Sequence, residues 1–175
     1  LDLFYPEHKP RNRVNMTLAK ALALYVTIYS PLHMVADLPE NLEGHPAMPW
    51  LEAVPTDWDT TLVLHAKIGD YTTFVRKDRR SDDWYLGAVT DDTGRLLEAP
   101  LSFLTPGRTY VAEAYEDGLD ADWRTEAGAL DLRISQRLVR STDTWPLRLA
   151  PGGGAALRFR PATREDERRL GSTRR

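Results

Sequence analysis

The sequence predicts a mixed fold, in which a C-terminal antiparallel β-sandwich is preceded by the last helix, strand and helix of a (β/α)8 barrel. Two observations support this. Short alternating apolar runs separated by turn residues fill positions 58–161, which is the spacing of a β-sandwich. A helical pattern, an apolar run and a second helical pattern fill positions 1–57, which is the rhythm of an α/β barrel, although three elements cannot close one.

The composition excludes several classes of protein. An apolar fraction of 42% in 175 residues is enough for a core, and a net charge of −3 without long single-sign runs argues against a nucleic-acid partner or a polybasic membrane patch. The absence of cysteine rules out disulfides and Cys-ligated zinc. No apolar run is long enough to predict a membrane span. The start has neither Met nor a basic segment, so we expect a piece whose targeting signal lies upstream.

The first helix is predicted over residues 16–29, with Asn15 as its N-cap. Apolar residues surround it almost completely, which is typical of a helix buried between two layers. Pro31 ends the helix. Cut away from a barrel, this helix is expected to leave a large exposed apolar patch that promotes association.

A buried parallel strand is predicted over residues 32–38, where an apolar run stops at Pro39, and a second helix over residues 47–54. Beyond residue 58, eight alternating runs predict strands at 61–66, 71–76, 84–89, 96–103, 109–115, 130–139, 144–149 and 155–159. The charged residues 162–175 lack apolar periodicity and are expected to be disordered.

Several segments carry a resemblance to a known family. The run at residues 17–41, TLAKALALYVTIYSPLHMVADLPEN, closely resembles the barrel end of glycoside hydrolase family 97. Five later segments resemble the same family in the same order: VPTDWD (54–59), GDY (69–71), SDDWYLG (81–87), DGLDADW (117–123) and APGGG (150–154). The resemblance covers about residues 1–161, and the order and spacing of the segments make it specific.

This resemblance implies a three-part enzyme with an N-terminal β-sandwich, a catalytic (β/α)8 barrel and a C-terminal β-sandwich. Residues 16–29, 32–38 and 47–54 would be barrel helix seven, strand eight and helix eight, and residues 58–161 a possible oligomerisation domain. Members hydrolyse α-glucosides or α-galactosides with paired carboxylates and a calcium ion. Those catalytic and calcium-binding groups lie upstream, so we expect no catalytic residue, metal ligand or cofactor in this chain. The expected partners are the rest of the barrel and a second subunit, in a bacterial enzyme that is exported or periplasmic.

Asp37 is the one candidate for substrate binding. It lies at the C-terminal end of the predicted strand 32–38, where barrel enzymes place their binding groups, and shares a strand face with His33 and Val35. An alternative is a structural role in capping the following loop. The family often has Gln at the position of His33, so we assign no proton transfer to that residue.

Other acidic and glycine-rich motifs favour structural roles. Glycoside hydrolysis needs two carboxyl groups facing one bond, whereas the adjacent acidic pairs lie in turn-like sequence: Asp57 and Asp59, Asp82 and Asp83, Asp91 and Asp92. Asp117, Asp120 and Asp122 lack the glycine and glutamate spacing of a calcium loop. The glycines at 152–154 are not followed by the Lys and Ser or Thr of a phosphate cradle, and His8, His33, His45 and His65 lack metal-ligand spacing.

Aromatic residues in the strands support a second hypothesis for the sandwich. An exposed row of rings would make it a carbohydrate-binding module, whereas buried rings would serve the core. The rings in question are Trp58, Trp84, Trp123, Trp145, Tyr71, Tyr85 and Tyr110. We expect the core role, and therefore predict a scaffold and association function rather than sugar binding or hydrolysis.

Overall fold

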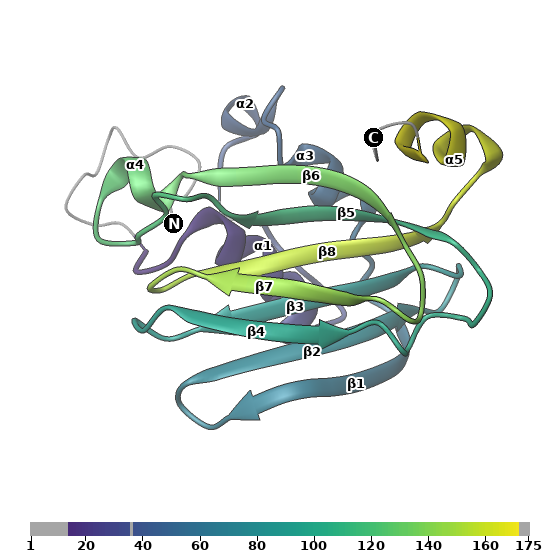
Figure 1. The fold of residues 1–175 in the computed structure, drawn as a ribbon. Helices are drawn as coiled ribbons and strands as arrows, with labels where there is room; N and C mark the ends of the chain where they lie inside the picture. Colours follow the sequence, from purple (N-terminus) through teal and green to yellow (C-terminus); the bar gives the residue numbers. More distant parts are fainter. Residues whose placement is uncertain (1–13, 36, 172–175) are drawn as a thin grey trace.

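The computed structural model describes residues 14–35 and 37–171, and its eight strands form two antiparallel sheets (Figure 1). The large sheet has the order β1-β2-β3-β8-β5-β6 and the small sheet pairs β4 with β7. The strands are β1 (Trp58–Lys67), β2 (Tyr71–Asp78), β3 (Trp84–Thr90), β4 (Arg95–Pro100), β5 (Tyr110–Asp117), β6 (Leu132–Val139), β7 (Thr144–Leu149) and β8 (Gly154–Pro161). This confirms the predicted antiparallel sandwich and all eight of its strands.

Helices cover the other face of the large sheet, so its middle lies between two layers (Figure 1). The helices are α1 (Leu18–Thr27), α2 (Pro39–Leu42), α3 (Met48–Ala53), α4 (Glu126–Ala129) and α5 (Arg164–Gly171). Helix α1 packs directly on β3 and β8. No helix in the described part of the chain has the length and apolar character needed to cross a bilayer.

Two apolar cores result from this layering. The first fills the space between the two sheets and contains Leu86, Leu147, Leu157 and Phe159, all almost fully buried. The second lies between the large sheet and the helices and is built around Trp50, with Leu22 of α1. Because side chains alternate along a strand, β3 and β8 serve both cores, which explains why their residues are buried on both faces.

The first helix is shorter than the predicted 16–29, and its N-cap is Thr17 rather than Asn15. The Thr17 hydroxyl accepts a hydrogen bond from the Lys20 backbone N–H at 3.2 Å, while Asn15 is exposed. Both residue types favour N-caps, and a contact distant in sequence decides between them. Helix α3 matches the predicted helix 47–54 to within a residue at each end.

The predicted strand at 32–38 is wrong for the described residues 32–35 and 37–38, which contain no strand. The segment folds back on α1 instead, where the Tyr25 hydroxyl donates to the carbonyl of Met34 at 3.2 Å. A strand needs a neighbouring strand to receive its backbone hydrogen bonds. None of the eight strands of the two sheets pairs with this segment.

The expected disorder at 162–175 is wrong for residues 164–171, which form α5. Asp166 in the first turn is buried and accepts hydrogen bonds from the backbone and hydroxyl of Thr163. Capping and ion pairing therefore order a segment that has almost no apolar residues. Residues 172–175 of the expected tail, and residues 1–13 of the expected barrel segment, lie outside the described residues.

The apolar patch expected on the first helix is largely covered. The stripe of Leu18, Ala19, Leu22, Ala23 and Val26 is at most 2% exposed, because the large sheet covers it. The expectation was wrong for this stripe because it assumed that only a barrel could bury the helix.

Removal of residues 1–57 is therefore expected to destabilise the sandwich. Burial of Leu18, Leu22 and Val26 contributes on the order of 5 kcal/mol, and their loss uncovers the sheet below them. A chain that begins at residue 58 should melt at a lower temperature and scatter more light than one that begins at residue 14. Equal melting temperatures for the two chains would contradict the packing role of α1.

Candidate functional site

The helix-side face of the large sheet brings together the polar groups of greatest interest, and two glycines set its geometry. A Cβ atom at Gly87 of β3 would lie 2.6 Å from the carbonyl oxygen of Ala23. A Cβ atom at Gly154 of β8 would lie 2.6 Å from the Cα of Lys20. Any side chain at these two positions would collide with α1. The two glycines therefore allow the helix to pack closely on the sheet.

The N-terminus of α1 is held by a buried carboxylate. The Thr17 hydroxyl donates to Asp117 Oδ1 at 2.6 Å, and Asp117 Oδ2 accepts from the backbone N–H groups of Ala150 and Gly154 at 2.8 and 2.9 Å. Burial raises the pKa of Asp117, and the hydrogen bonds from Thr17, Ala150 and Gly154 oppose that rise. A negative charge near the first turn also interacts favourably with the positive end of the helix dipole.

The C-terminus of α1 is held by a buried arginine from β2. Arg76 donates from Nε to the carbonyl of Val26 at 2.6 Å and from Nη1 to the Thr61 hydroxyl at 3.1 Å. Its guanidinium also lies over the rings of Tyr29 and Trp58. A cation at the last turn satisfies a free carbonyl and complements the dipole, so charged side chains of the sheet fix both ends of α1.

Helix α3 joins the same assembly through its tryptophan. Trp50 is 1% exposed and donates from Nε1 to the carbonyl of Leu22 at 3.2 Å. Its ring packs against Tyr85 of β3 and Tyr115 of β5. The Tyr85 hydroxyl donates to the carbonyl of Ala53 at 2.8 Å, and burial raises the pKa of Tyr85. Helices α1 and α3 and the sheet therefore form one packed unit.

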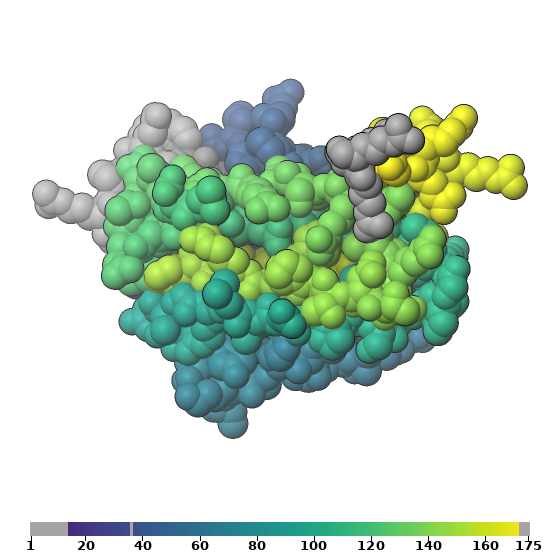
Figure 2. All heavy atoms as spheres, viewed as in Figure 1, coloured from purple at the N-terminus to yellow at the C-terminus, as the bar shows by residue number. Residues whose placement is uncertain are grey.

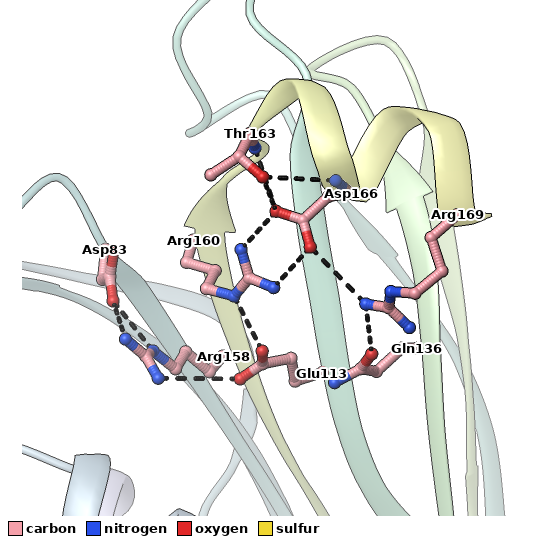
Figure 3. A network of polar contacts seen from close by, with 8 residues as sticks. All are labelled: Asp83, Glu113, Gln136, Arg158, Arg160, Thr163, Asp166 and Arg169. Atoms are coloured by element: carbon pink, nitrogen blue, oxygen red, sulfur yellow. Dashed lines mark hydrogen bonds and ion pairs between the residues drawn. The ribbon is translucent and has the colours of Figure 1, made fainter. Parts of the chain in front are cut away.

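A chain of ion pairs continues across the sheet beyond this aromatic cluster (Figure 3). Arg158 of β8 pairs with Asp83 at 2.7 Å and approaches Glu113 of β5 to 3.7 Å. Arg160, two residues further along the same face, donates to Glu113 at 2.8 Å and to both oxygens of Asp166 at 2.7 and 2.8 Å. The network links the residue before β3, and strands β8 and β5, to helix α5.

Asp166 is the residue that secures α5. Hydrogen bonds from Arg160 are the main reason that its pKa lies well below the ordinary carboxyl range. A carboxylate with a depressed pKa contributes stability above its unfolded-state pKa, and that stability is lost as the pH falls toward the folded-state value. The docking of α5 should therefore be fully stabilised at neutral pH and weaken progressively once the pH falls below the ordinary carboxyl range.

An apolar surface remains uncovered on the side of α1 that faces away from the sheet. Ala21 and Leu24 on α1 are half-buried, and Ile28, just after the helix, is 55% exposed. The segment after the helix adds four large apolar side chains that are 64–79% exposed: Tyr29, Leu32, Met34 and Leu38. We call these seven residues the outer apolar surface.

Asp37 lies just before α2. Its Oδ1 accepts hydrogen bonds from the backbone N–H of Leu38 and from Asn41 Nδ2, both at 2.7 Å. These contacts give Asp37 a local role at the start of α2.

The ring of His33 packs against Tyr25 with centroids 5.2 Å apart, and burial lowers the pKa of His33.

Four of the six carboxylates in the adjacent acidic pairs form ion pairs with arginines rather than facing a shared cleft. These ion pairs are Asp57 with Arg79, Asp82 with Arg108, Asp83 with Arg158 and Asp91 with Arg95. Asp70 and Asp91 border an open groove of about 420 Å³ beside α1, but both pair with Arg95, which holds the pKa of Asp91 far below normal. A general acid needs a raised pKa, so this pair is unsuited to glycoside hydrolysis.

A second groove, of about 180 Å³, lies between β6 and β7. Glu116, which lines the groove, accepts a hydrogen bond from Trp145 Nε1 at 2.8 Å, and the Arg137 guanidinium lies 3.7 Å from the centre of the same indole. Asp117 also borders this groove, but its side chain is bonded to Thr17 of α1. The two neighbouring carboxylates are therefore engaged with separate partners.

The other motifs also have structural partners. Asp122 pairs with Arg124 at 2.8 Å, and the Asp120 backbone N–H donates to Asp131. Among residues 14–35 and 37–171, no three His, Asp or Glu side chains gather closely enough to hold a metal ion, so these residues do not fit a calcium site. His8 lies outside the described residues.

The backbone of the glycine run 152–154 packs closely around the carboxylate of Asp117. A Cβ atom at Gly153 would lie 1.9 Å from Asp117 Oδ2, and Gly152 has a φ of 64°, which favours glycine. The run therefore lets the backbone approach the Asp117 carboxylate. Sequence reasoning did not identify this role of the glycines or the roles of Arg76 and Asp166. The glycines and Arg76 contact residues that are distant in the sequence. Asp166 contacts Arg160 across an irregular link between β8 and α5.

Most of the aromatic rings are buried. Exposure is 9% or less for five of the seven considered: Trp58, Trp84, Trp145, Tyr85 and Tyr110. Trp123 and Tyr71 are half-buried, and Arg95 lies over the Tyr71 ring. Sugar-binding platforms need exposed flat rings, so these seven residues do not form one.

Comparison with known proteins identifies the family. The model of the glycosyl hydrolase 97 C-terminal domain, described as an oligomerisation domain, matches residues 57–160. The chain belongs to glycoside hydrolase family 97. A retaining α-galactosidase of Bacteroides thetaiotaomicron is 35% identical over 145 residues, which are 82% of this chain and 21% of that protein. A probable retaining α-galactosidase of Streptomyces bingchenggensis is 27% identical over 150 residues, which are 85% and 21% of the two chains.

Solved structures agree with this assignment. A family 97 enzyme from Pseudoalteromonas sp. strain K8 in complex with acarbose superposes with a TM-score of 0.82 and 45% identity, covering 87% of this chain and 24% of that one. A β-arabinopyranosidase superposes with a TM-score of 0.63 and 26% identity, covering 82% and 21%. This family 97 chain thus spans about a fifth to a quarter of these relatives and is a C-terminal portion.

The Thr17–Asp117 contact should be important for stability. Replacing Thr17 by Val removes both the N-cap and a hydrogen bond to a buried carboxylate, which should cost about 1–3 kcal/mol in urea unfolding. The control is Thr142→Val, since Thr142 is exposed. Equal unfolding midpoints for the two variants would show that the contact contributes little.

Asp166→Asn should release α5 without unfolding the sheet. The change removes the charge that binds Arg160, so amide hydrogen exchange in residues 164–171 should become about tenfold faster or more at neutral pH. Glu165→Gln, an exposed change in the same turn, should leave the exchange rate unaltered. Unchanged exchange in the Asp166→Asn variant would mean that other contacts hold the helix.

Proposed function

We propose that this chain is the carboxyl end of an α-glycosidase, and that it supports the catalytic barrel and takes part in subunit association without catalysing hydrolysis. The observation that carries the proposal is the fixation of α1 at both ends by Asp117 and Arg76. A helix anchored to the sheet on one side, with the outer apolar surface on the other, is suited to joining a sandwich to a barrel.

The outer apolar surface is the part of the chain that would meet the rest of the barrel. Contiguous exposed apolar side chains mark contact sites in proteins. With barrel strands beside it, the segment 32–38 could pair with one of them and form the strand that its sequence predicts. The domain limits 1–57 and 58–161 remain predictions under this proposal, with α1 and α3 shared between barrel and sandwich.

The substrate of the whole enzyme would be an α-galactoside or an α-glucoside. The names of the two curated relatives support the first, and the acarbose complex of the Pseudoalteromonas enzyme supports the second. The catalytic carboxylates and calcium would belong to upstream barrel segments. Asp37 would lie at a strand end in the intact barrel, where a substrate-binding role stays a prediction beside its observed bonds to Leu38 and Asn41.

A carbohydrate-binding module was the alternative function. It needs exposed aromatic rings, and the burial of Trp58, Trp84 and Trp145 does not favour it. The scaffold function therefore has the stronger support.

An assay on this chain alone tests the proposal. Aryl α-galactosides and aryl α-glucosides should show no turnover above buffer, and calorimetric titration with galactose and maltose should show no saturable heat. An α-glucosidase of known activity serves as the positive control for the glucoside assay. Turnover that persists through purification, or sugar binding abolished by Trp123→Ala, would overturn the scaffold proposal.

A further inference from the structure

The groove between β6 and β7 lies along one side of the sandwich, where the two sheets face each other. Strand β6 is the last strand of the large sheet, and β7 belongs to the small sheet. Figure 1 shows β6 above β7, and Figure 2 shows both strands on the face turned toward the viewer, in green and yellow-green. Side chains from the two strands and from the loop after β5 therefore line the groove.

Three arginines gather around this groove. Because side chains alternate along a strand, Arg133 and Arg137 lie on the same face of β6, with Ser135 between them. Arg148 comes from β7, on the other side of the groove. All three arginines are exposed. Both walls therefore supply guanidinium groups, which bind the oxygens of a carboxylate or phosphate through pairs of parallel hydrogen bonds.

Two of the arginines lie at the same end of the groove. Arg133 pairs in register with Glu116, one residue before the end of β5. Arg148 donates from Nη1 to the carbonyl of Gly118 at 2.8 Å and from Nη2 to the carbonyl of Leu119 at 2.9 Å. These acceptors are neutral, so they orient the Arg148 guanidinium without cancelling its charge.

The two acidic residues of the groove are bonded to other groups. Glu116 is 8% exposed and accepts from Trp145 Nε1, and Asp117 accepts from the hydroxyl that caps α1. In the described part of the chain, neither Arg133 nor Arg148 forms an ion pair with a carboxylate. Three arginines beside two engaged carboxylates leave the groove positively charged.

The dimensions of the groove favour a small ligand. Its volume of about 180 Å³ is below the roughly 300–1,000 Å³ of pockets for drug-sized molecules. An extended peptide that adds to a strand edge is the competing occupant, but Pro146 on the β7 wall has no backbone N–H to donate. Prolines are typical of edges that do not accept another strand. Recognition of a small anion by side chains is therefore favoured.

We propose that this groove binds a small oxyanion, in the form of a phosphate or carboxylate group, between the guanidinium groups of Arg133 and Arg148. The hydroxyl of Ser135 and the guanidinium of Arg137, which lies over the Trp145 ring, extend the row of donors along the groove. The two kinds of anion share the same guanidinium chemistry. The proposal goes beyond the scaffold role and does not depend on it.

Calorimetric titration of the chain with inorganic phosphate and with malonate tests the site. Chloride keeps the ionic strength constant, because salt screens exposed charges. Either probe should give saturable heat with a Kd of about 1 mM, and the tighter probe identifies the preferred group. Absence of saturation by both probes up to about 20 mM would overturn the proposal.

Substitution of single arginines separates a site from a general charge effect. Arg133→Gln and Arg148→Gln should each weaken phosphate binding about tenfold or more, because each removes a charge-assisted contact. Arg140→Gln is the matched control, since Arg140 is exposed in the turn after β6 and its loss changes the net charge equally. Equal weakening by Arg133→Gln and Arg140→Gln would overturn the site.

Glu116→Gln provides a test of the opposite sign. A glutamine oxygen can still accept from Trp145 Nε1, whereas the negative charge beside the arginines is lost. Phosphate affinity should therefore rise several-fold. Unchanged or weaker affinity would contradict a site at this end of the groove.

Nuclear magnetic resonance locates the bound anion. Phosphate should shift the amide signals of residues 118–119 and 133–137, and the largest shifts in any other region would overturn the assignment. A hexaglutamate peptide examines the competing occupant and should bind no more tightly than malonate. An affinity more than about tenfold higher would show that the groove recognises an acidic peptide instead of a small anion.

Discussion

The buried carboxylate of Asp117 is the interaction on which the arrangement of the chain depends most. It receives hydrogen bonds from the hydroxyl that caps α1, from the residue after β7 and from the start of β8. A buried carboxylate is costly unless such donors surround it, and removing one donor leaves charge without compensation. Together with Arg76 at the other end of α1, Asp117 makes the helix part of the sandwich rather than an appendage to it.

The packed unit of this family 97 chain begins before the family match does. The family model begins at residue 57, yet the second apolar core includes Leu18, Leu22 and Trp50 from before that point. The limits of sequence similarity and of the packed unit therefore differ. The ion-pair network with Asp166 likewise extends the folded unit beyond residue 160, where the match ends.

The strands could be predicted from the sequence because alternation and turn residues are local signals, and the eight predicted runs correspond to β1–β8. Features that depend on distant partners could not. Thr17 and Asn15 are equivalent as caps until Asp117, 100 residues away, is considered. Helix α5 has no apolar pattern and is held by Arg160. The segment 32–38 has the composition of a strand, but none of the eight strands pairs with its described residues.

The candidate site was less accessible to sequence reasoning than the fold. The glycine run 152–154 was interpreted as flexible backbone, whereas it brings N–H groups to a carboxylate. Arg76 gave no signal, because one arginine in an alternating strand resembles any surface residue. The resemblance to family 97, in contrast, was visible in six ordered segments, and the matching family model confirms it.

Gly87 and Gly154 have a consequence for the evolution of the enzyme. They set the distance between helix and sheet by having no side chain, so a single methyl group at either position would move α1 outward and tilt whatever follows it. That shift would pass along the chain to the segment after α1, which carries Asp37. Two hydrogen atoms facing a helix can thus set the spacing between a helix layer and a sheet.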